Sequence, residues 1–516
     1  MRLIDFFDKG VESGPDRICF DDGGRRYTYA EVASASHRIA GVLRHVGLKK
    51  GARIATYSPN SAEAFIAVLG VQRAGCVWLP VNVRNLVAEN VEFLRENDCE
   101  LLFFHSRYRA EAETMVQALP ALRAVICVDR GAPGYSVLED WAAEFPADPH
   151  DVPMNGHDVA IIKSTGGTTG RPKSVMITHL NMETMIASFL ASIPLPEPPV
   201  HLLAVPMTHG AGNIAFALMT RGATTIVLDR ADPDRILAAI EAHRVTVLFL
   251  PPTVIYTLLG RPDIKNRDFS SLRNLIYSAA PMSADKLDEA LTVFGPVMTQ
   301  AYGQTEAPLL CTFMSPADHL VPDPAERRRR LLSCGKPTPF VDLAIMSDDG
   351  LLLGRDEVGE IVVRGNLVMK GYANNPTETE AASRFGWHHT GDVGRRDAEG
   401  WVYIVDRKKD MIISGGFNIY PSEIEQVLWS HPAVQDCAVI GVPDSKWGEA
   451  VKAVIELKPG ASGEADEFIG FCKMQLGSMK APKSVEIWRE LPRSSLGKVV
   501  KRDIRDRFWA GQDRQV

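Results

Sequence analysis

The sequence predicts an α/β protein with a large N-terminal domain of parallel sheets flanked by helices, a β-rich subdomain, and a small C-terminal α+β domain. Helical and strand patterns alternate along the first part of the chain, as they do in parallel sheets covered by helices. Short strands separated by turns follow position 350. With 516 residues, the chain is also too long for a single hydrophobic core, so two or three domains are expected.

The first predicted elements alternate in type. Residues 29–46 place apolar side chains at helical spacing, and residues 53–57 predict a short buried strand. Residues 61–74 predict a second helix, and residues 77–80 predict a second strand. This alternation indicates a parallel sheet, because the crossover between two parallel strands is usually a helix.

Three further apolar strands are predicted at 159–163, 224–228 and 245–250. Between the first two, residues 202–220 form an uncharged run that has the length of a membrane span. Pro206 and several polar residues interrupt this run, so it fits a buried helix after a loop better. We therefore expect no integral membrane segment.

The chain changes character after position 350. Short alternating strands follow, with residues 360–364 the clearest, and they predict a β-rich subdomain. A strand at 401–405 then meets the charged run 406–410. We place a domain boundary there, at Asp406.

A small α+β unit is predicted beyond this boundary. Its predicted elements are a helix starting at Ser422 and strands at 438–442 and 451–457. In the last strand, apolar and charged residues alternate, which is typical of a half-buried strand. The chain is thus divided into an N-terminal domain, residues 1–405, and a C-terminal domain, residues 406–516.

The composition is that of an ordinary globular protein and excludes several classes. A net charge of −7 and an isoelectric point near 6.0 argue against a nucleic-acid partner, which would call for a basic face. The eight cysteines are scattered without Cys-x-x-Cys spacing, which favours reduced thiols and no zinc site. Charges within the first five residues argue against a secretory signal, so we expect a cytoplasmic protein.

A loop rich in glycine and hydroxyl side chains follows the strand predicted at 159–163. Its sequence is Ser164-Thr165-Gly166-Gly167-Thr168-Thr169-Gly170-Arg171-Pro172-Lys173-Ser174. Glycines let backbone N–H groups approach an oxyanion closely, hydroxyls add donors, and Lys173 adds a positive charge. The loop is not a Walker A motif, because two residues separate Gly170 from Lys173. A flexible surface loop is the alternative, and other motifs are needed to decide.

Five more motifs follow in the chain. They are Pro206-Met207-Thr208-His209-Gly210, Tyr302-Gly303-Gln304-Thr305-Glu306, Thr390-Gly391-Asp392, Asp406-Arg407-Lys408-Lys409-Asp410 and Gly497-Lys498. In this order, and together with the glycine-rich loop, they resemble the adenylate-forming superfamily of acyl-CoA synthetases, luciferases and peptide-synthetase adenylation domains. The resemblance runs from about Tyr27 to Lys498. Ser164, Gly166 and Ser174 depart from it, since the family usually has an aromatic residue, serine and glycine there.

The resemblance implies an ATP-dependent acyl-CoA ligase. In such an enzyme a carboxylate attacks the α-phosphorus of ATP, pyrophosphate leaves, and a thiol then displaces AMP from the acyl-adenylate. It implies ATP, Mg²⁺ and coenzyme A as co-substrates and cofactors, a small carboxylic acid as substrate, and a C-terminal domain that swings about a hinge at Asp406. A homodimer stays open as its assembly.

Three other classes remain open at this point. One is a free-standing acyl-adenylating protein that loads a carrier-protein thiol, another is a luciferase-like oxygenase, and the last is a non-catalytic nucleotide-binding protein. Lys498, Glu306 and Asp392 occur together, which disfavours the last class.

The resemblance also implies the residues of the nucleotide site. By it, Tyr302 packs on adenine, Thr305 contacts the α-phosphate, and Asp392 and Arg407 hold the ribose. The ATP-binding set is Thr165, Gly166, Gly167, Thr168, Thr169, Gly170, Lys173, Ser278, Ala279, Ala280, Tyr302, Gly303, Thr305, Asp392, Arg407 and Lys498. Glu306 and Thr165 are the implied metal ligands, and a hard carboxylate oxygen suits Mg²⁺. The implied catalytic residues are Lys498, Thr165, Glu306 and His209.

Lys498 is implied to contact both the substrate carboxylate and the α-phosphate. Its plainer interpretation is one lysine among several in a basic tail. The neighbouring His388 and His389 have no evident third ligand, so we assign them no metal. The hinge residue Asp406 is expected to stay solvated.

The acyl pocket is implied to lie at His209, Gly210, Ala211 and Ala280. No acidic residue occurs between positions 202 and 228 to pair with a substrate ammonium, which disfavours an amino acid. Its expected walls are small and contain no lysine or arginine; they are Gly210, Ala211, Gly212, Ala215, Ala279 and Ala280. We expect a roomy apolar cavity for a monocarboxylic fatty or aromatic acid. Close packing of helix on sheet is the plainer explanation of these small residues.

The evidence for coenzyme A is thinner. By the same resemblance, Gly415 and Gly416 flank the pantetheine tunnel and Trp447 stacks on the coenzyme A adenine. Residues 479–483 lack the aromatic residue and the arginine that some relatives also use. Ordinary packing is the alternative for Trp447.

Overall fold

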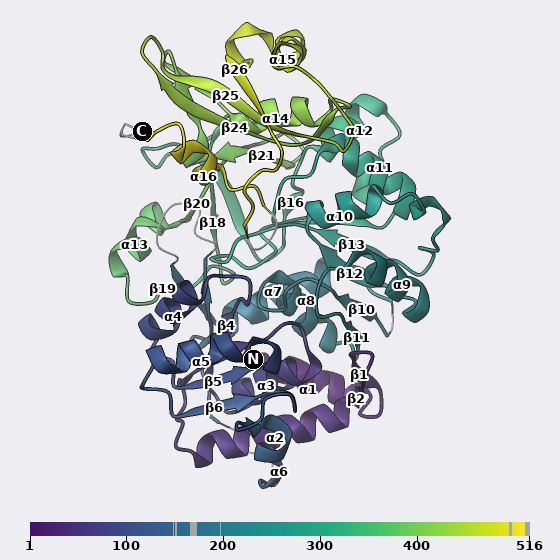
Figure 1. Ribbon diagram of the computed structural model, residues 1–516, viewed down its shortest axis with the longest axis vertical. Helices are drawn as coiled ribbons and strands as arrows, with labels where there is room; N and C mark the ends of the chain where they lie inside the picture. Colours follow the sequence, from purple (N-terminus) through teal and green to yellow (C-terminus); the bar gives the residue numbers. More distant parts are fainter. Residues whose placement is uncertain (148, 150–151, 166–172, 197, 495–497, 511–516) are drawn as a thin grey trace.

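The computed structural model describes residues 1–147, 149, 152–165, 173–196, 198–494 and 498–510. Figure 1 shows a large part built on sheets flanked by helices, a β-rich subdomain above it, and the C-terminal elements α14, α15, α16, β24, β25 and β26 at the top. The predicted α/β fold class is confirmed.

The first sheet of the large part has nine strands within the described residues. In spatial order they are β16 (Lys336–Pro337), β15 (Thr312–Met314), β14 (Met298–Tyr302), β13 (Asn274–Tyr277), β12 (Val247–Leu250), β10 (Val200–Leu203), β11 (Thr224–Val227), β1 (Ile18–Asp21) and β2 (Arg26–Thr28). The strands from β14 through β13, β12, β10 and β11 to β1 are parallel, as the alternation of helix and strand predicts.

The second sheet of the large part contributes eight strands to the described structure. They run in the order β19 (Gly371–Tyr372), β9 (Ser174–Thr178), β8 (Val159–Ser164), β4 (Val77–Val81), β3 (Arg53–Tyr57), β5 (Leu101–Phe104), β6 (Ala124–Cys127) and β7 (Ser136–Val137). From β8 to β7 the strands are parallel, whereas β9 and β19 pair antiparallel at one edge.

Helices cover and separate these sheets. Those of the large part are α1 (Leu3–Ser13), α2 (Tyr29–His45), α3 (Ala62–Arg73), α4 (Val87–Glu96), α5 (Arg109–Ala118), α6 (Leu138–Ala143), α7 (His179–Ser192), α8 (Gly210–Met219), α9 (Pro233–His243), α10 (Pro252–Leu259), α11 (Ala284–Phe294) and α12 (Pro324–Leu331). Figure 1 shows α7 and α8 in the middle of the molecule, between the strands of the two sheets. Every residue of α8 from Ala211 to Met219 is buried, so the uncharged run predicted as a buried helix is one.

The helix starts follow signals that are visible in the sequence. Thr28 caps α2 in a capping box with Glu31, and the Ser61 hydroxyl accepts a hydrogen bond from the backbone N–H of Ala64 at the start of α3. Both helices therefore begin within a residue of the predicted positions. None of the described helices is long and apolar enough to span a membrane. All eight cysteines are buried free thiols.

The β-rich subdomain is a sheet of four antiparallel strands in the described structure. These are β17 (Asp342–Met346), β18 (Gly359–Arg364), β20 (His388–Arg396) and β21 (Val402–Arg407), with α13 (Pro376–Ala381) in the connection between β18 and β20. β21 runs through the predicted domain boundary, because Asp406 and Arg407 still pair with β20.

The C-terminal unit packs its helices on a sheet with a core of its own. Its elements are β22 (Ile412–Ser414), β23 (Phe417–Ile419), α14 (Pro421–Trp429), β24 (Val434–Asp444), β25 (Gly448–Leu457), α15 (Ala465–Lys480), β26 (Ser484–Trp488) and α16 (Lys501–Asp506). β24 extends beyond its predicted bounds at both ends, because it pairs with β25 along its whole length. α14 begins at Pro421 rather than Ser422, and proline is well suited to a first helical position.

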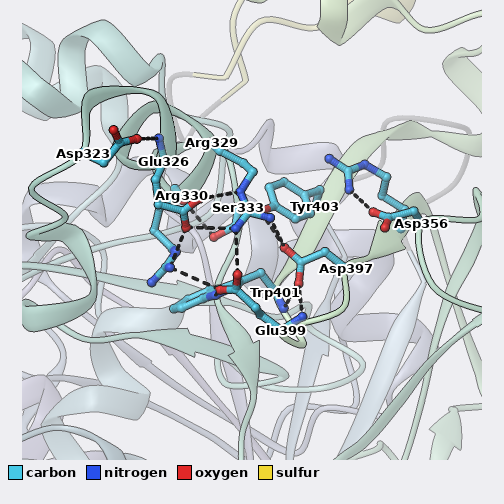
Figure 2. A network of polar contacts seen from close by, with 11 residues as sticks. Asp323, Glu326, Arg329, Arg330, Ser333, Asp356, Asp397, Glu399, Trp401 and Tyr403 are labelled. Carbon is cyan, nitrogen blue, oxygen red and sulfur yellow. Dashed lines mark hydrogen bonds and ion pairs between the residues drawn. The ribbon is translucent and has the colours of Figure 1, made fainter.

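An ion-pair network joins helix α12 of the large part to the β-rich subdomain (Figure 2). Arg329 in α12 contacts Glu326 in its own helix and, across the gap, Asp397 and Glu399 in the turn between β20 and β21. Asp397 is buried and also accepts a hydrogen bond from the Tyr403 hydroxyl at 3.0 Å. The network therefore fixes the β-rich subdomain, and with it Asp392 in β20, relative to the large sheet.

Candidate active site

The motif residues gather where strands of both large sheets end. The glycine-rich loop follows β8, the segment Ser278 to Ala280 follows β13, and the segment from Tyr302 to Glu306 begins at the end of β14. His209 directly precedes α8, between the sheets. Crevices outside the carboxyl ends of parallel strands are the usual ligand sites of α/β proteins.

Two non-glycine residues near these strand ends have backbone angles that side chains disfavour. Ala279 has φ 75° and Leu309 has φ 64°. A Cβ placed on Gly303 would lie 2.6 Å from backbone atoms of Leu309, so only glycine fits there. Strained backbone of this kind is concentrated at functional sites. Ser278 and Ala279 thus occupy a constrained loop beside the chain around Gly303.

Asp392 is the centre of a cluster of polar contacts. Its Oδ2 accepts hydrogen bonds from the Tyr302 hydroxyl at 2.6 Å and from Gln304 Nε2 at 2.9 Å. Its Oδ1 forms an ion pair with Arg407 Nε at 2.7 Å. A carboxylate accepts about four hydrogen bonds, so Oδ1 retains room for one more donor. Gln304 was not among the predicted site residues, although it stands inside a predicted motif.

Glu306 is half-buried beside the same cluster. Its Oε1 accepts a hydrogen bond from the Tyr372 hydroxyl at 2.9 Å, whereas Oε2 has no hydrogen-bond partner among the described residues. Thr305 precedes it in the chain and is also partly exposed. The described residues contain no group of three or more His, Cys, Asp or Glu side chains placed to hold a metal. One free carboxylate oxygen fits a Mg²⁺ ion that is held mainly by phosphate and water.

The glycine-rich loop is closed at its base by two residues. The backbone N–H of Thr165 donates to the Lys173 carbonyl at 2.9 Å, and the Lys173 N–H donates to the Thr165 hydroxyl at 3.0 Å. The predictions for Gly166, Gly167, Thr168, Thr169 and Gly170 lie outside the described residues. Ser174, where the family has glycine, is buried and accepts a hydrogen bond from Asn97 at 2.8 Å.

Lys173 has a protein partner in this structure. Its ammonium forms an ion pair with Glu378 in α13 and lies 4.8 Å from the centre of the Tyr372 ring. Since the Tyr372 hydroxyl also contacts Glu306, a short chain of contacts links Lys173 to the predicted metal ligand.

His209 is partly buried between the sheets. Its Nδ1 lies 2.9 Å from the Thr208 hydroxyl. Burial, together with the charges of Lys163, Lys498 and Arg84, lowers the pKa of His209 to about 3. The imidazole is therefore neutral at physiological pH, and positive charge surrounds it.

Lys498 reaches this site from the C-terminal unit. Its backbone carbonyl accepts a hydrogen bond from the Ser494 N–H at 2.7 Å. Burial and the charge of Arg407 lower the pKa of Lys498 to about 8, although the charge of Asp392 opposes the shift. The structure thus brings Lys498 into the electrostatic surroundings of Asp392, Arg407 and His209.

The residues predicted to line the acyl pocket differ in how much space lies beside them. A Cβ on Gly210 would make ordinary contacts with Phe249 and Leu309 at 3.7 and 3.8 Å, so these side chains line the space next to Gly210. A Cβ on Gly212 would lie 2.0 Å from the Met207 carbonyl oxygen, so close packing requires that glycine. Ala211 and Ala215 are fully buried in α8, and Ala280 is partly exposed after β13.

One buried cation beside α8 was missed. Lys163 in β8 is 8% exposed, and its Nζ donates to Asn213 Oδ1 in α8 at 2.7 Å. The prediction that no lysine or arginine lines this region considered only the residues near His209 in the sequence. A lysine at the end of an apolar strand was the signal that could have identified it.

Asp406 is buried, and the expectation that it stays solvated is wrong. Its side chain is 6% exposed, and it accepts hydrogen bonds from the backbone N–H groups of Arg407 at 2.7 Å and Ser422 at 2.8 Å. The reason is that Asp406 caps the start of α14, which satisfies a backbone donor that the helix leaves free. Burial raises the pKa of this carboxyl.

The predicted coenzyme A residues cluster in the C-terminal unit. Gly415 and Gly416 have φ 58° and 82°, and the Gly415 N–H donates to the Trp447 carbonyl at 2.8 Å. A Cβ on Gly415 would lie 2.6 Å from the Trp447 ring. Trp447 is 45% exposed, so one part of the indole packs on glycine and the remainder faces solvent.

Comparison with protein families matches residues 7–373 to the AMP-binding enzymes and residues 423–498 to the AMP-binding enzyme C-terminal domain. The chain is 37% identical to a feruloyl-CoA synthase from Amycolatopsis sp, over 96% of each chain. It is 34% identical to the medium/long-chain-fatty-acid–CoA ligase FadD8 of Mycobacterium tuberculosis (strain ATCC 25618 / H37Rv), over 96% of this chain and 88% of that protein.

Among solved structures, the crystal structure of ATP-bound MatB from Rhodopseudomonas palustris is similar, with a TM-score of 0.89 and 29% identity. The likeness covers 98% of this chain and 99% of that one. The motifs, the fold and these matches agree. The chain belongs to the family of AMP-binding enzymes, the adenylate-forming enzymes that its motifs resemble.

Proposed function

We propose that this protein is an ATP-dependent acyl-CoA ligase that activates a fatty or aromatic carboxylic acid through an acyl-adenylate. The observation that carries the proposal is the meeting of Lys498 with Asp392, Arg407 and His209, from separate parts of the chain, at one site. Support also comes from the relatives, since one is a feruloyl-CoA synthase and another a fatty-acid–CoA ligase.

The nucleoside end of the site would be formed around Asp392. In the proposal the remaining acceptor capacity of Asp392 Oδ1 receives a ribose hydroxyl, and Arg407 holds the carboxylate in place at 2.7 Å. Tyr302, fixed by its own hydrogen bond to Asp392, would pack on adenine together with the constrained Ser278-Ala279-Ala280 segment. Gly303 would let the backbone pass close to the nucleotide.

The phosphate end would use Thr165, Thr305, Lys173 and Glu306, with the glycine-rich loop. Mg²⁺ bound at Glu306 would neutralise phosphate charge and bridge phosphate oxygens. Lys173 would exchange Glu378 for a phosphate oxygen when ATP binds, because both partners are anions and the ion pair is partly exposed.

Lys498 would contact the substrate carboxylate and the α-phosphate. A carboxylate oxygen attacks the α-phosphorus, the bond to pyrophosphate breaks, and negative charge develops on oxygens that repel one another. A positive charge already positioned there lowers the barrier. The pKa of Lys498, about 8, keeps most of the side chain protonated at neutral pH. Neutral His209 would line the entry of the acyl pocket.

The second half-reaction would transfer the acyl group to coenzyme A. The thiol sulfur bonds to the acyl carbon, the bond from that carbon to the AMP oxygen breaks, and the thiol proton leaves to solvent. We place the hinge for this step at Asp406, between domains 1–405 and 406–516. Rotation there would remove Lys498 and bring Gly415, Gly416 and Trp447 toward the adenylate.

Acid-dependent release of pyrophosphate tests the proposal. A panel of fatty and aromatic acids is assayed with ATP and Mg²⁺, with and without coenzyme A. We expect release that depends on the acid, and turnover and thioester formation that require coenzyme A. Turnover without dependence on coenzyme A would favour a carrier-protein loading enzyme instead. No release with any acid would contradict the proposed function.

A further inference from the structure

We propose that a buried polar group formed by Lys163, Asn213 and Thr56 binds a neutral oxygen substituent of the substrate. The substrate would then be a carboxylic acid whose acyl group carries a hydroxyl or carbonyl oxygen remote from the carboxylate. This inference rests on the proposed function, because it names the substrate class of the same site.

The Lys163 amine has unused hydrogen-bonding capacity. Lys163 and Asn213 are 8% and 5% exposed, and they meet through a hydrogen bond of 2.7 Å from Nζ to Oδ1. An ammonium carries three N–H donors, and the asparagine oxygen is its sole acceptor in the described part of the chain. No ion pair with a described carboxylate accompanies it. Two donors of the ammonium thus lie in the interior without an acceptor from the residues that the structure describes.

A hydroxyl with free capacity lies on the same face of the second sheet. Thr56 in β3 pairs with Pro80 in β4, and Trp78, two residues earlier in β4, pairs with Ile161 in β8. The register places Thr56 and Lys163 at one level of the sheet, two strands apart, with their side chains toward α8. The Thr56 hydroxyl is fully buried and lacks a hydrogen-bond partner among the described residues.

Ser58 repeats the pattern two residues farther along the chain. Its hydroxyl is buried and likewise without a partner in the described structure. The next residue of this series, Asn60, is fully used: it donates to the carbonyls of Val205 and Leu228 and accepts from the Met207 N–H at 2.8 Å. Asn60 therefore links the chain that follows the carboxyl end of β3 to the segment that leads to His209.

The buried polar group belongs to the acyl end of the site. α8 begins directly after His209, and Asn213 lies one turn into that helix. The charges of Lys163 and Lys498 both lower the pKa of His209, so both amines lie within electrostatic reach of one imidazole. In the proposed reaction Lys498 holds the carboxylate that is activated, which leaves Lys163 for an atom farther along the acyl group.

A neutral oxygen suits this group better than a second carboxylate. Burial alone lowers the pKa of Lys163 to about 7, so near neutral pH the amine is about equally charged and uncharged. An amine in either form donates to a hydroxyl or carbonyl oxygen. A buried polar group without a partner is costly, and a ligand oxygen that supplies the missing acceptor would be bound in preference to a methylene. The expected apolar cavity would therefore have a polar end.

Matched pairs of acids test the inference. The kcat/KM for acid-dependent pyrophosphate release is measured for cinnamic acid, 4-hydroxycinnamic acid and 4-carboxycinnamic acid, and for decanoic and 10-hydroxydecanoic acid. At least one hydroxylated acid is expected to exceed its parent by about tenfold or more, mainly through KM. In Lys163→Met this preference should fall to about one, because the donor that would bind the oxygen is lost.

The controls separate binding from folding. Lys473→Met removes an exposed lysine from α15 and should leave the preference unchanged. Lys163→Gln keeps a donor in the interior and should retain part of the preference. Three results would overturn the inference: no hydroxylated acid preferred by the unaltered protein, a preference that survives in Lys163→Met, or a 4-carboxy acid preferred over the 4-hydroxy acid.

A binding measurement keeps this test independent of turnover. Calorimetric titration of the same acids in the presence of AMP needs no adenylation. Tighter binding of a hydroxylated acid by the unaltered protein, lost in Lys163→Met, supports the inference even if no acid releases pyrophosphate, which would contradict only the proposed function. Equal affinity for both members of each pair overturns the inference even if adenylation proceeds.

Discussion

The two ends of the candidate site differ in how fully their buried polar groups are paired. At the nucleoside end, Asp392 accepts from Tyr302 and Gln304 and is paired with Arg407. At the acyl end, Lys163 is buried as well, and its one partner within the described residues is the neutral Asn213. The first end is preassembled for a ligand that every turnover shares. At the acyl end, polar groups lack partners among the described residues, and we expect these groups to determine which acid is bound.

The largest effect is expected at Lys498, which is close to both ends. Lys498→Ala should lower adenylate formation about 10³-fold or more, because preorganised charge next to developing negative charge is lost. Thioester formation from a supplied acyl-adenylate and coenzyme A should stay within about threefold of the unaltered enzyme. Rapid-quench assays of each half-reaction measure this. Equal loss of both would show that the amine does not serve adenylation alone.

A second variant tests the paired end by itself. Asp392→Asn keeps the size of the side chain but removes the charge that holds Arg407, and hydrogen bonds to charged groups contribute about 1.5–3 kcal/mol. The KM for ATP should rise about 10- to 100-fold, with the order of preference among acids unchanged. Steady-state kinetics with ATP and acid varied in turn measure it, and Asp356→Asn, at an exposed ion pair, is the control. A changed order of preference among acids would show that the nucleoside end also influences which acid is bound.

A third prediction concerns stability at the unpaired end. The pKa of Lys163, about 7 when folded, lies below the usual value of about 10.4, so between these values the unfolded chain binds more protons. Stability should therefore rise with pH across this window in the unaltered protein. Lys163→Met removes the buried amine and should raise the unfolding midpoint by about 2 °C or more at pH 6.

This advantage of Lys163→Met should shrink as the pH approaches the usual lysine pKa of about 10.4, because the folded amine is already neutral there and the unfolded amine loses its proton at little cost. Scanning calorimetry at pH 6, 8 and 10 follows it, with Lys473→Met as the control. A destabilised Lys163→Met at pH 6 would show that Lys163 has a stabilising partner within the protein.

The smallest effect is expected in the ion-pair network of Figure 2. It tests how much a buried ion pair remote from the site contributes to the stability of the protein. Arg329→Ala leaves buried Asp397 without its ion pair, and should lower the unfolding midpoint by about 2 °C, corresponding to about 1 kcal/mol. Arg328, in the same helix, pairs with exposed Asp285, so Arg328→Ala should change the midpoint by less than about 1 °C. Equal shifts would mean that burial does not decide the value of these ion pairs.

Local signals in the sequence explain how much of the fold could be predicted. The alternation of apolar patterns located helices and strands to within a few residues, and the structure shows that Thr28 and Ser61 cap two of these helices. The full length of β24 could not be predicted, because Pro443 and Asp444 do not resemble strand residues and are held there by pairing with β25. Likewise, Asp406 looked like a hinge in solvent, whereas its helix-capping role depends on Ser422.

The two ends of the candidate site also differ in how far the sequence alone predicts them. Tyr302, Asp392 and Arg407 stand in short contiguous motifs, so the sequence alone indicates the residues of the nucleoside end. Lys163, Asn213 and Thr56 lie far apart in the chain and share a face only through strand register and the seating of α8 between the sheets. No short motif encodes such a group, and the sequence alone therefore suggested an apolar pocket.

Joining a carboxylate to the α-phosphorus of ATP transfers one oxygen atom of the acid to AMP. An acid labelled by ¹⁸O in both carboxylate oxygens, followed by mass spectrometry of the products of one turnover with ATP and coenzyme A, tests this step. We expect one ¹⁸O atom in AMP and none in pyrophosphate. AMP without the label, or label in pyrophosphate, would show that the site catalyses a different reaction.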